Sequence, residues 1–281
     1  MKKRLMYTIS FFFLLLQFGT SHIVDAKTFD DPYFPISFRI QVLPWEDVDK
    51  IIPVGAKFTI FDVQTGLYFQ VQRRAGRHHA DVQPLTPKDM KIMKTIYGGK
   101  WSWRRKPILV LAEDLFIAAS MNGMPHGAGA LKNNFRGHFC VHFYGSLTHK
   151  RKMEDLAHKL MILKAGGKLE VYLQEVNPYD VLQILAVAVN QQDSFLMNWV
   201  FDDSGCKNCV VSALQNLSSM KIDPKVNKED IEKPGHFIVA IPSVVHYYSK
   251  NGQGKRTMNF ILHKNSIVEP WKISLQNFEW H

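Results

Sequence analysis

The chain has 281 residues, a formal net charge of +10 and a hydrophobic content of 46%. This composition is that of a globular protein and excludes a disordered chain. The length allows one large domain or two ordinary domains. The positive charge favours an anionic partner, and the alternative is that it only keeps the protein soluble.

The first 26 residues resemble a secretory signal peptide. Basic residues at positions 2–4 precede an apolar run over residues 5–18, and Val24 and Ala26 suit cleavage after Ala26. The run is shorter than the roughly 20 residues that span a bilayer, although an uncleaved anchor is the alternative. We therefore expect an exported protein, secreted or associated with the cell wall, with no transmembrane segment after cleavage. Export argues against nucleic acid as the partner and favours peptidoglycan or another anionic cell-wall polymer.

The first half of the mature chain is predicted to be mainly β. After a Pro-containing lead-in over residues 27–53, alternating apolar residues indicate a hairpin over residues 57–72 with a turn at Gly66. Thr86 followed by Pro87 is typical of the start of a helix. Further strands are expected at residues 101–103, 108–111, 115–119, 138–143 and 169–173, and helices at residues 87–97 and 153–161.

The second half is predicted to be an α+β domain. Asn177 can cap a helix, and Pro178 suits its first position. Helices are expected at residues 178–189 and 195–201, followed by strands at 236–241, 244–249, 257–263 and 267–275. Because helices followed by antiparallel strands differ from the β-rich first half, we place a boundary near residue 176, between domains at 27–176 and 177–281. The second domain resembles the cystatin-like or NTF2-like shape, which implies a binding or assembly module.

Three cysteines occur, at positions 140, 206 and 209. An odd number in an exported protein leaves at least one thiol unpaired. Cys206 and Cys209 are close enough to form a disulfide that braces a turn, and the alternative is a redox pair. A redox Cys-x-x-Cys opens a helix beside a βαβ unit, which we do not predict here. Cys140 is therefore the expected free thiol.

The residues around Cys140 suit a nucleophile. In the strand at 138–143, apolar residues alternate with His138, Cys140 and His142, which share the opposite face. His126 is placed to return over this face through a Gly-rich loop, and a base beside a thiol makes the thiolate accessible. Glycines in the loop would let backbone N–H groups approach a developing oxyanion; they are Gly127, Gly129 and Gly137.

These residues resemble the L,D-transpeptidases. That family carries His-Gly, a loop and a Ser-His-Gly-Cys-Ile/Val-Arg segment; this chain has His126-Gly127, a loop, and Gly-His-Phe-Cys-Val-His over residues 137–142. The resemblance implies a β-sandwich catalytic domain that cross-links or trims peptidoglycan stem peptides and requires no cofactor or metal. It implies Cys140 as the acylated nucleophile, His126 as its base and His138 as a supporting group. We expect substrate binding at Gly127, Asn134, Gly137 and His142.

Departures from the family pattern leave alternatives open. Phe139 stands where the family has Gly, Gly137 where it has Ser or Thr, and His142 where it usually has Arg. One alternative is therefore a non-catalytic exported binding protein with a drifted motif. Another is a zinc-dependent peptidase, although the chain lacks His-Glu-x-x-His. Its metal ligands would be His138 and His142, together with Cys140, on one strand face, and His79 and Asp81 from the preceding loop.

Overall fold

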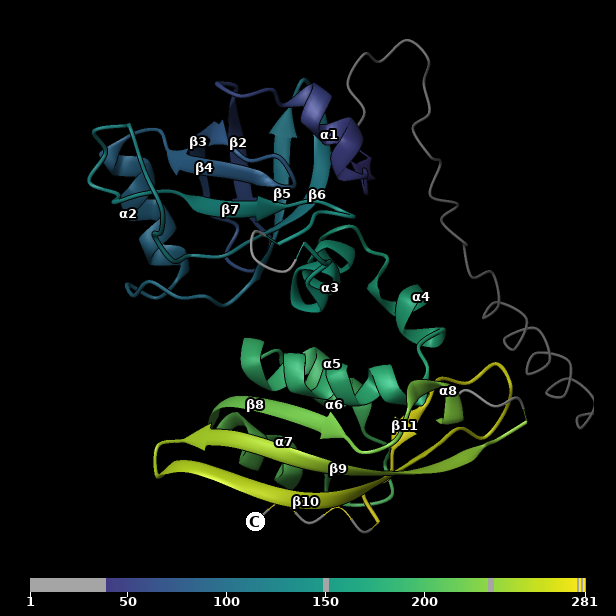
Figure 1. Cartoon of the computed structure of the whole chain (residues 1–281). Helices are drawn as coiled ribbons and strands as arrows, with labels where there is room; N and C mark the ends of the chain where they lie inside the picture. Colours follow the sequence, from purple (N-terminus) through teal and green to yellow (C-terminus); the bar gives the residue numbers. More distant parts are fainter. Residues whose placement is uncertain (1–38, 149–151, 232–234, 277, 279, 281) are drawn as a thin grey trace, which may run out of the picture. The chain divides into compact units, whose positions relative to one another are not determined.

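The computed structural model describes residues 39–148, 152–231, 235–276, 278 and 280. The expected signal peptide over residues 1–26 lies outside these ranges. Within them the protein is a mixed α/β protein, with a barrel-like sheet in the first half and a second sheet accompanied by helices in the other half (Figure 1). This confirms the coarse prediction of a β-rich part followed by an α+β part.

A seven-stranded sheet in the first half closes on itself. Its strands are β1 Ile40–Gln41, β2 Lys57–Asp62, β3 Tyr68–Ala75, β4 Ala80–Pro84, β5 Lys106–Ala112, β6 Leu115–Met121 and β7 Phe139–His142, with helices α1 Trp45–Ile51 and α2 Pro87–Ile96. The order is β1-β6-β5-β2-β3-β4-β7, and β7 also pairs with β6. The four-residue strand β7 therefore closes the barrel, a feature that the expected sandwich did not include.

Local sequence signals explain two of these elements. Gly66 has a φ of 70° in the turn between β2 and β3, and Asp62 accepts hydrogen bonds from the backbone N–H and the hydroxyl of Thr65. Thr86 caps α2, because its hydroxyl accepts a hydrogen bond from Asp89 N–H while the Asp89 carboxylate accepts one from Thr86 N–H. The predicted hairpin and the predicted helix start are both confirmed.

Alternate strand residues fill the barrel interior. Val82 of β4, Met121 of β6 and Val141 of β7 are fully buried in one hydrophobic cluster. Burying each such side chain stabilises the fold by about 1.5–3 kcal/mol. Because successive side chains point to opposite faces of a strand, the intervening polar residues lie on the outer face of the sheet. Cys140, between two interior residues of β7, therefore belongs to this outer face, as its alternation predicted.

Helices come first in the second half, and a four-stranded antiparallel sheet follows. The helices are α3 Leu156–Ala165, α4 Leu169–Gln174, α5 Pro178–Gln191, α6 Ser194–Val200, α7 Lys207–Gln215 and α8 Lys228–Ile231; the strands are β8 Leu217–Pro224, β9 Ile238–Ser249, β10 Gly252–His263 and β11 Lys272–Ile273. Asn177 caps α5 by accepting a hydrogen bond from Asp180 N–H, as predicted. The sheet has the order β11-β10-β9-β8, and α5 packs against β8.

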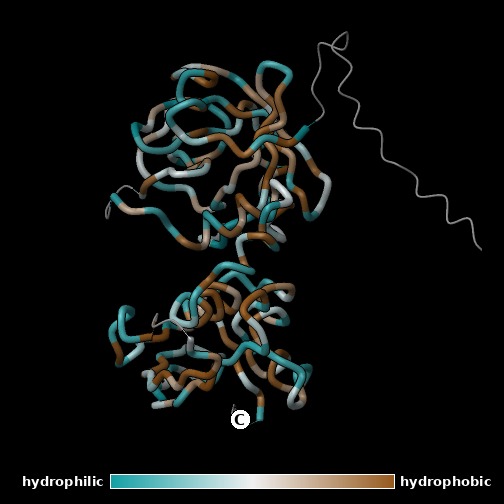
Figure 2. Tube along the Cα trace, turned by 90° about the vertical axis from the view of Figure 1, so that its right-hand side faces the viewer, coloured by the Kyte–Doolittle hydropathy of each residue, from teal (hydrophilic) through white to brown (hydrophobic). Residues whose placement is uncertain are grey.

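A second hydrophobic cluster joins these helices and this sheet. It begins at Leu160 in α3 and reaches Trp280, while Ile162 and Ala165 of the same helix pack against Ala118 of β6. Figure 2 shows hydrophobic residues recurring along the Cα trace of both halves. The predicted division at residue 176 stays a prediction. Within the ranges that the structure describes, no helix is both long and apolar enough to cross a membrane.

Several predicted elements differ from the structure. The expected strand at 169–173 is helix α4, because Leu169 and Leu173 are both buried one helical turn apart. Residues 101–103 precede β5 instead of forming a strand. The strands expected at 236–241 and 244–249 are one strand, β9, which continues through Pro242. Only two residues of the expected strand at 267–275 are extended, in β11.

Candidate active site

Three strands bring polar side chains together around Cys140. In the antiparallel ladders, Cys140 of β7 lies opposite Asp81 of β4, and His142 lies opposite Ser120 of β6. Residues directly opposite each other in such a ladder project from the same face of the sheet. The register therefore gathers a cysteine, a carboxylate, a histidine and a hydroxyl on the outer face of the barrel. Cys140 is the free cysteine of the described chain, and its exposed fraction is 4%.

His126 directly contacts the thiol. Its Nε2 lies 3.1 Å from Cys140 Sγ, and its Nδ1 lies 2.8 Å from the Met124 carbonyl oxygen. Because a carbonyl oxygen can only accept, Nδ1 carries the proton that it donates there, and Nε2 of the neutral ring is the acceptor that faces the sulfur. This is the arrangement that a general base needs in order to take the thiol proton.

Two backbone hydrogen bonds hold His126 in place. His126 N–H donates to the His138 carbonyl at 2.9 Å, and His138 N–H donates to the His126 carbonyl at 2.8 Å. The loop between His126 and His138 therefore brings His126 next to the beginning of strand β7, which carries Cys140. The N–H of His138 is engaged in this bridge, so an oxyanion would have to use other donors.

The bridge requires glycine at two positions. Gly137 has a φ of 86°, and a Cβ there would lie 2.3 Å from the His126 carbonyl oxygen. Gly127 has a φ of 61°, and a Cβ there would lie 2.3 Å from Cε1 of His138. Only glycine adopts such angles without strain. The lack of a side chain at Gly137 therefore allows two backbone segments to approach closely, whereas at Gly127 it leaves room for the His138 ring.

Asp81 lies at the centre of the cluster. Its Oδ1 is 3.2 Å from His79 Nε2, 3.6 Å from His138 Nε2 and 3.8 Å from Cys140 Sγ. His79 Nδ1 lies 2.8 Å from the Leu147 carbonyl oxygen, and His138 Nδ1 lies 3.0 Å from the Ala128 carbonyl oxygen. Both rings thus present Nε2 towards the carboxylate while a main-chain oxygen fixes Nδ1.

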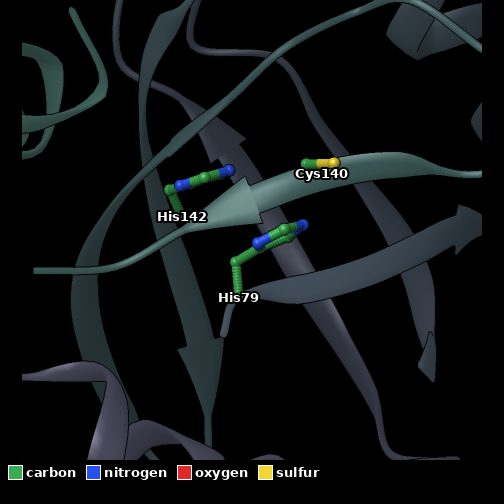
Figure 3. Close-up of side chains that lie close together, drawn as sticks. All are labelled: His79, Cys140 and His142. Atoms are coloured by element: carbon green, nitrogen blue, oxygen red, sulfur yellow. The ribbon is translucent and has the colours of Figure 1, made fainter. Parts of the chain in front are cut away.

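Three stacked imidazole rings lie on the buried side of Cys140. The ring centroids of His79 and His142 are 4.4 Å apart, and those of His142 and His158 are 3.8 Å apart. Figure 3 shows the first two rings beside each other, with Cys140 further along the same strand as His142. Burial, together with neighbouring positive charge, lowers the pKa of His142 and of His158 well below the usual value. These two rings are therefore neutral at physiological pH.

Burial also decides the resting state of the reactive pair. It raises the pKa of the Cys140 thiol, and the nearby Asp81 carboxylate raises it further. It lowers the pKa of His126 as well. The pair therefore rests as a neutral thiol and a neutral imidazole, and the proton must move when the sulfur attacks.

The loop that carries His126 is anchored to strand β4. The Gln83 carboxamide oxygen accepts hydrogen bonds from Ala130 N–H at 2.9 Å and Leu131 N–H at 3.1 Å. Asn133 is fully buried, donates to the Pro84 carbonyl and accepts from Phe135 N–H. Neither residue was predicted, because the burial of Gln83 and Asn133 depends on tertiary packing and not on the local sequence.

The predicted site residues fall into two groups. The structure brings His126, His138, Cys140, Gly127, Gly137, His79, Asp81 and His142 into one cluster. Asn134, expected to bind substrate, lies outside the cluster, exposed in the loop with a φ of 62°. His142 belongs to the cluster, but it is 3% exposed between two stacked rings, which indicates packing instead of substrate binding. Cys206 and Cys209 form a disulfide at the start of α7.

Two further residues, His158 and Trp103, lie beside the cluster. His158 of α3 extends the histidine stack, and its Nδ1 lies 3.0 Å from Ser120 Oγ. The half-exposed Trp103 lies against His126, with ring centroids 5.1 Å apart. Both residues reach the cluster through tertiary packing, Trp103 from the segment before β5 and His158 from helix α3.

Comparison with known proteins found no matching family model, no matching curated protein and no matching solved structure.

Proposed function

We propose that the protein is a cysteine acyl transferase that acts on peptidoglycan stem peptides, in the manner of the L,D-transpeptidases. The observation that carries the proposal is the 3.1 Å contact between His126 Nε2 and Cys140 Sγ, with His126 Nδ1 bound to a main-chain carbonyl. A thiol, a correctly oriented base and a group that orients the base are the parts that nucleophilic acyl transfer requires. The barrel-like sheet would then be this protein's form of the family's β-rich catalytic domain.

The chemical steps start from the neutral Cys140 thiol and the neutral His126 imidazole. Cys140 Sγ attacks the carbonyl carbon of the donor stem peptide while its proton moves to His126 Nε2. The tetrahedral intermediate collapses when His126 returns this proton to the leaving amine, and a thioester at Cys140 remains. The amine of an acceptor stem peptide then attacks the thioester, gives up a proton through His126 and releases the thiol. No oxidant, metal or cofactor enters this balance.

The direction of substrate approach follows from burial. The buried side of Cys140 is closed by three histidines, each with an exposed fraction of 3% or less: His79, His142 and His158. His126 and His138 are only partly buried, and Trp103 beside His126 is 51% exposed. The substrate therefore approaches over the edge formed by His126, His138 and Trp103. An aromatic platform at this edge suits contacts with the body of a peptide or a sugar.

Acylation of the purified chain tests the proposal. A carbapenem, which acylates reactive thiols, should add a single adduct at Cys140 in the intact mass of the chelator-treated chain. Cys140→Ser should abolish the adduct, and His126→Gln should slow its formation by about 10²–10⁴-fold, because a general base contributes a factor of that size. His246→Gln is the matched control, because its partly exposed ring lies in strand β9.

Two outcomes would overturn the proposal. One is a folded chain that forms no adduct at Cys140. The other is a His126→Gln variant that is acylated at the rate of the His246→Gln control. Thermal unfolding of each variant checks that the loss of acylation is not a loss of fold.

The second half of the chain is proposed as a binding or assembly module. Two features support this proposal. Helix α5 packs against β8, and helices come before a curved antiparallel sheet in the chain, as they do in cystatin-like and NTF2-like domains.

A further inference from the structure

The atoms around Cys140 also include several types of metal ligand that lie close together. His126, His138 and Cys140 offer ligand atoms that all lie within 4.8 Å of one another. Asp81 Oδ1 adds a carboxylate oxygen 3.8 Å from Cys140 Sγ and 3.6 Å from His138 Nε2. Thiolate, imidazole and carboxylate are the three ligand types of protein zinc sites.

The separations suit a tetrahedral ion. Bonds of about 2.0–2.3 Å to nitrogen, oxygen and sulfur place neighbouring ligands of a tetrahedral zinc ion roughly 3.3–3.6 Å apart. The three distances of 3.1, 3.6 and 3.8 Å within this set lie close to that range. Of the three remaining pairs, His126–His138 and His138–Cys140 have ligand atoms within 4.8 Å of each other.

The groups behind the ligands fit a metal site as well. Metal-bound histidines usually donate their other ring nitrogen to a carbonyl or carboxylate, which fixes the tautomer. His126 Nδ1 faces the Met124 carbonyl and His138 Nδ1 faces the Ala128 carbonyl, so each Nε2 is the nitrogen directed at the cluster. His79 Nε2, 3.2 Å from Asp81 Oδ1, would hold the ligating carboxylate.

We propose that His126, His138, Cys140 and Asp81 form a binding site for a divalent ion of the zinc class. Nitrogen and sulfur ligands favour zinc over magnesium or calcium, which prefer oxygen. His79, Cys140 and His142 also offer ligand atoms within 4.8 Å of one another. We choose the first set because His126 and His138 are partly exposed and give an ion a path of entry.

Occupancy of the site would compete with acyl transfer. The ion would take both the thiolate of Cys140 and the Nε2 lone pair of His126, which are the nucleophile and the base of the proposed function. Zinc would thus act as a reversible inhibitor. Binding itself does not depend on the proposed activity.

Metal binding by the untagged full chain tests this site. After dialysis against Zn²⁺ and removal of free ion, the protein should retain one zinc per chain. Co²⁺ in place of zinc should give a sulfur-to-cobalt charge-transfer band, which reports the thiolate directly. His246→Gln and the double variant Cys206→Ser, Cys209→Ser should keep both signals, because these residues lie outside the site.

Ligand variants give the decisive comparison. Cys140→Ser should lose the charge-transfer band, and both Cys140→Ser and His138→Gln should weaken zinc binding at least about 10-fold, as removal of metal-site groups commonly does. A wild-type chain that retains no zinc overturns the inference. So do variants that hold zinc as tightly as His246→Gln, or a loss of zinc caused by His142→Gln but not by His138→Gln. Thermal unfolding of each variant identifies a loss that is due to misfolding.

The two proposals can fail separately. A chain that binds zinc but is not acylated in the presence of chelator supports the metal site and contradicts the transferase. A chain that is acylated at Cys140 but binds no zinc does the reverse. If both hold, addition of Zn²⁺ should slow acylation in proportion to occupancy, and chelator should restore it.

Discussion

At the scale of single residues, the reactive pair depends on a residue that has no side chain. Gly137 lies between the loop and strand β7, with a φ of 86°. A Cβ at this position would lie 2.3 Å from the His126 carbonyl oxygen and 2.8 Å from the Gly127 carbonyl oxygen. Real Cβ atoms do not approach backbone oxygens so closely, so the bridge that holds His126 would have to open.

We predict that Gly137→Ala is more harmful than its small size suggests. The left-handed backbone conformation alone should cost about 1–2 kcal/mol of unfolding free energy. The clash should add to this and should move His126 away from Cys140, so acylation should fall together with stability. Denaturant unfolding and the rate of acylation measure the two effects.

Gly145→Ala supplies the control for this prediction. Gly145 has a φ of 74°, and a Cβ there would meet no atom within 4 Å. It therefore carries the cost of the backbone conformation without the clash. If both variants lose the same stability and both are acylated normally, the steric account of Gly137 is wrong.

At the scale of secondary-structure elements, the site is the junction of short strand β7 with the loop at 122–138. The loop is fixed to the sheet through Gln83 of β4, whose side chain is fully buried. Its carboxamide oxygen accepts from two loop N–H groups. Each such hydrogen bond stabilises the fold by about 0.5–1.5 kcal/mol. The position of His126 thus depends on a residue that never touches it.

We predict that Gln83→Leu loosens the loop. Ala130 and Leu131 lose their hydrogen-bond acceptor, so the unfolding free energy should fall by about 1–3 kcal/mol, the net value of two hydrogen bonds. Their amide hydrogens should exchange faster, and acylation should slow while Cys140 is still present. Hydrogen exchange followed by mass spectrometry of the loop peptides measures the effect.

Gln70→Leu is the comparison for Gln83→Leu. Gln70 lies in the neighbouring strand β3, and its side chain is exposed. This variant should change stability by less than about 0.5 kcal/mol, which is usual for surface positions. Unchanged exchange at Ala130 and Leu131 in Gln83→Leu would contradict the anchoring role of Gln83.

Local sequence patterns predicted part of the site, and the rest depends on contacts between distant strands. Alternation over residues 138–143 placed Cys140 and His142 on one face, because period-2 patterns are local. The return of His126 through the glycine loop followed from motif spacing. The closure of the barrel by β7 and the contact of Asp81 with Cys140 depend on pairing between distant strands, which local patterns do not encode. His158 was missed for the same reason, since α3 joins the cluster only through tertiary packing.

Helix α4 shows the other limit of sequence patterns. Residues 169–173 read as a short strand because Leu169, Val171 and Leu173 alternate with polar residues. Leu169 and Leu173 also satisfy the spacing of a helical turn, and short apolar patterns do not separate the two cases. In the structure Leu169 and Leu173 are buried, whereas Val171 is 64% exposed, which is the pattern of a helix.

At the scale of the whole molecule, a carboxylate in the second half joins segments that are far apart in the chain. Asp202 accepts hydrogen bonds from His263 Nε2 at 2.8 Å, from Leu275 N–H at 3.0 Å and from the N–H and hydroxyl of Ser204. The network connects the end of α6 with β10 and with the residues after β11. Burial acts to raise the pKa of Asp202, but these hydrogen bonds outweigh it and lower the pKa to about 2.

We predict that Asp202 stabilises the chain in a pH-dependent way. An unfolded Asp titrates near pH ~3.9, so the folded state binds this proton less readily than the unfolded state does. The stabilisation should be complete above about pH 5 and should disappear as the pH falls towards 2. Asp202→Asn should therefore lower the unfolding free energy at neutral pH by about 1–2 kcal/mol, the usual net value of such hydrogen bonds. The difference from wild type should shrink on acidification.

Asp203→Asn is the control, since the Asp203 side chain is 92% exposed. Thermal or denaturant unfolding between pH 7 and pH 2 measures the difference between each variant and the wild type, in which the general effect of acid on this basic chain cancels. A difference for Asp202→Asn that stays constant over this range would show that Asp202 does not act through its charge.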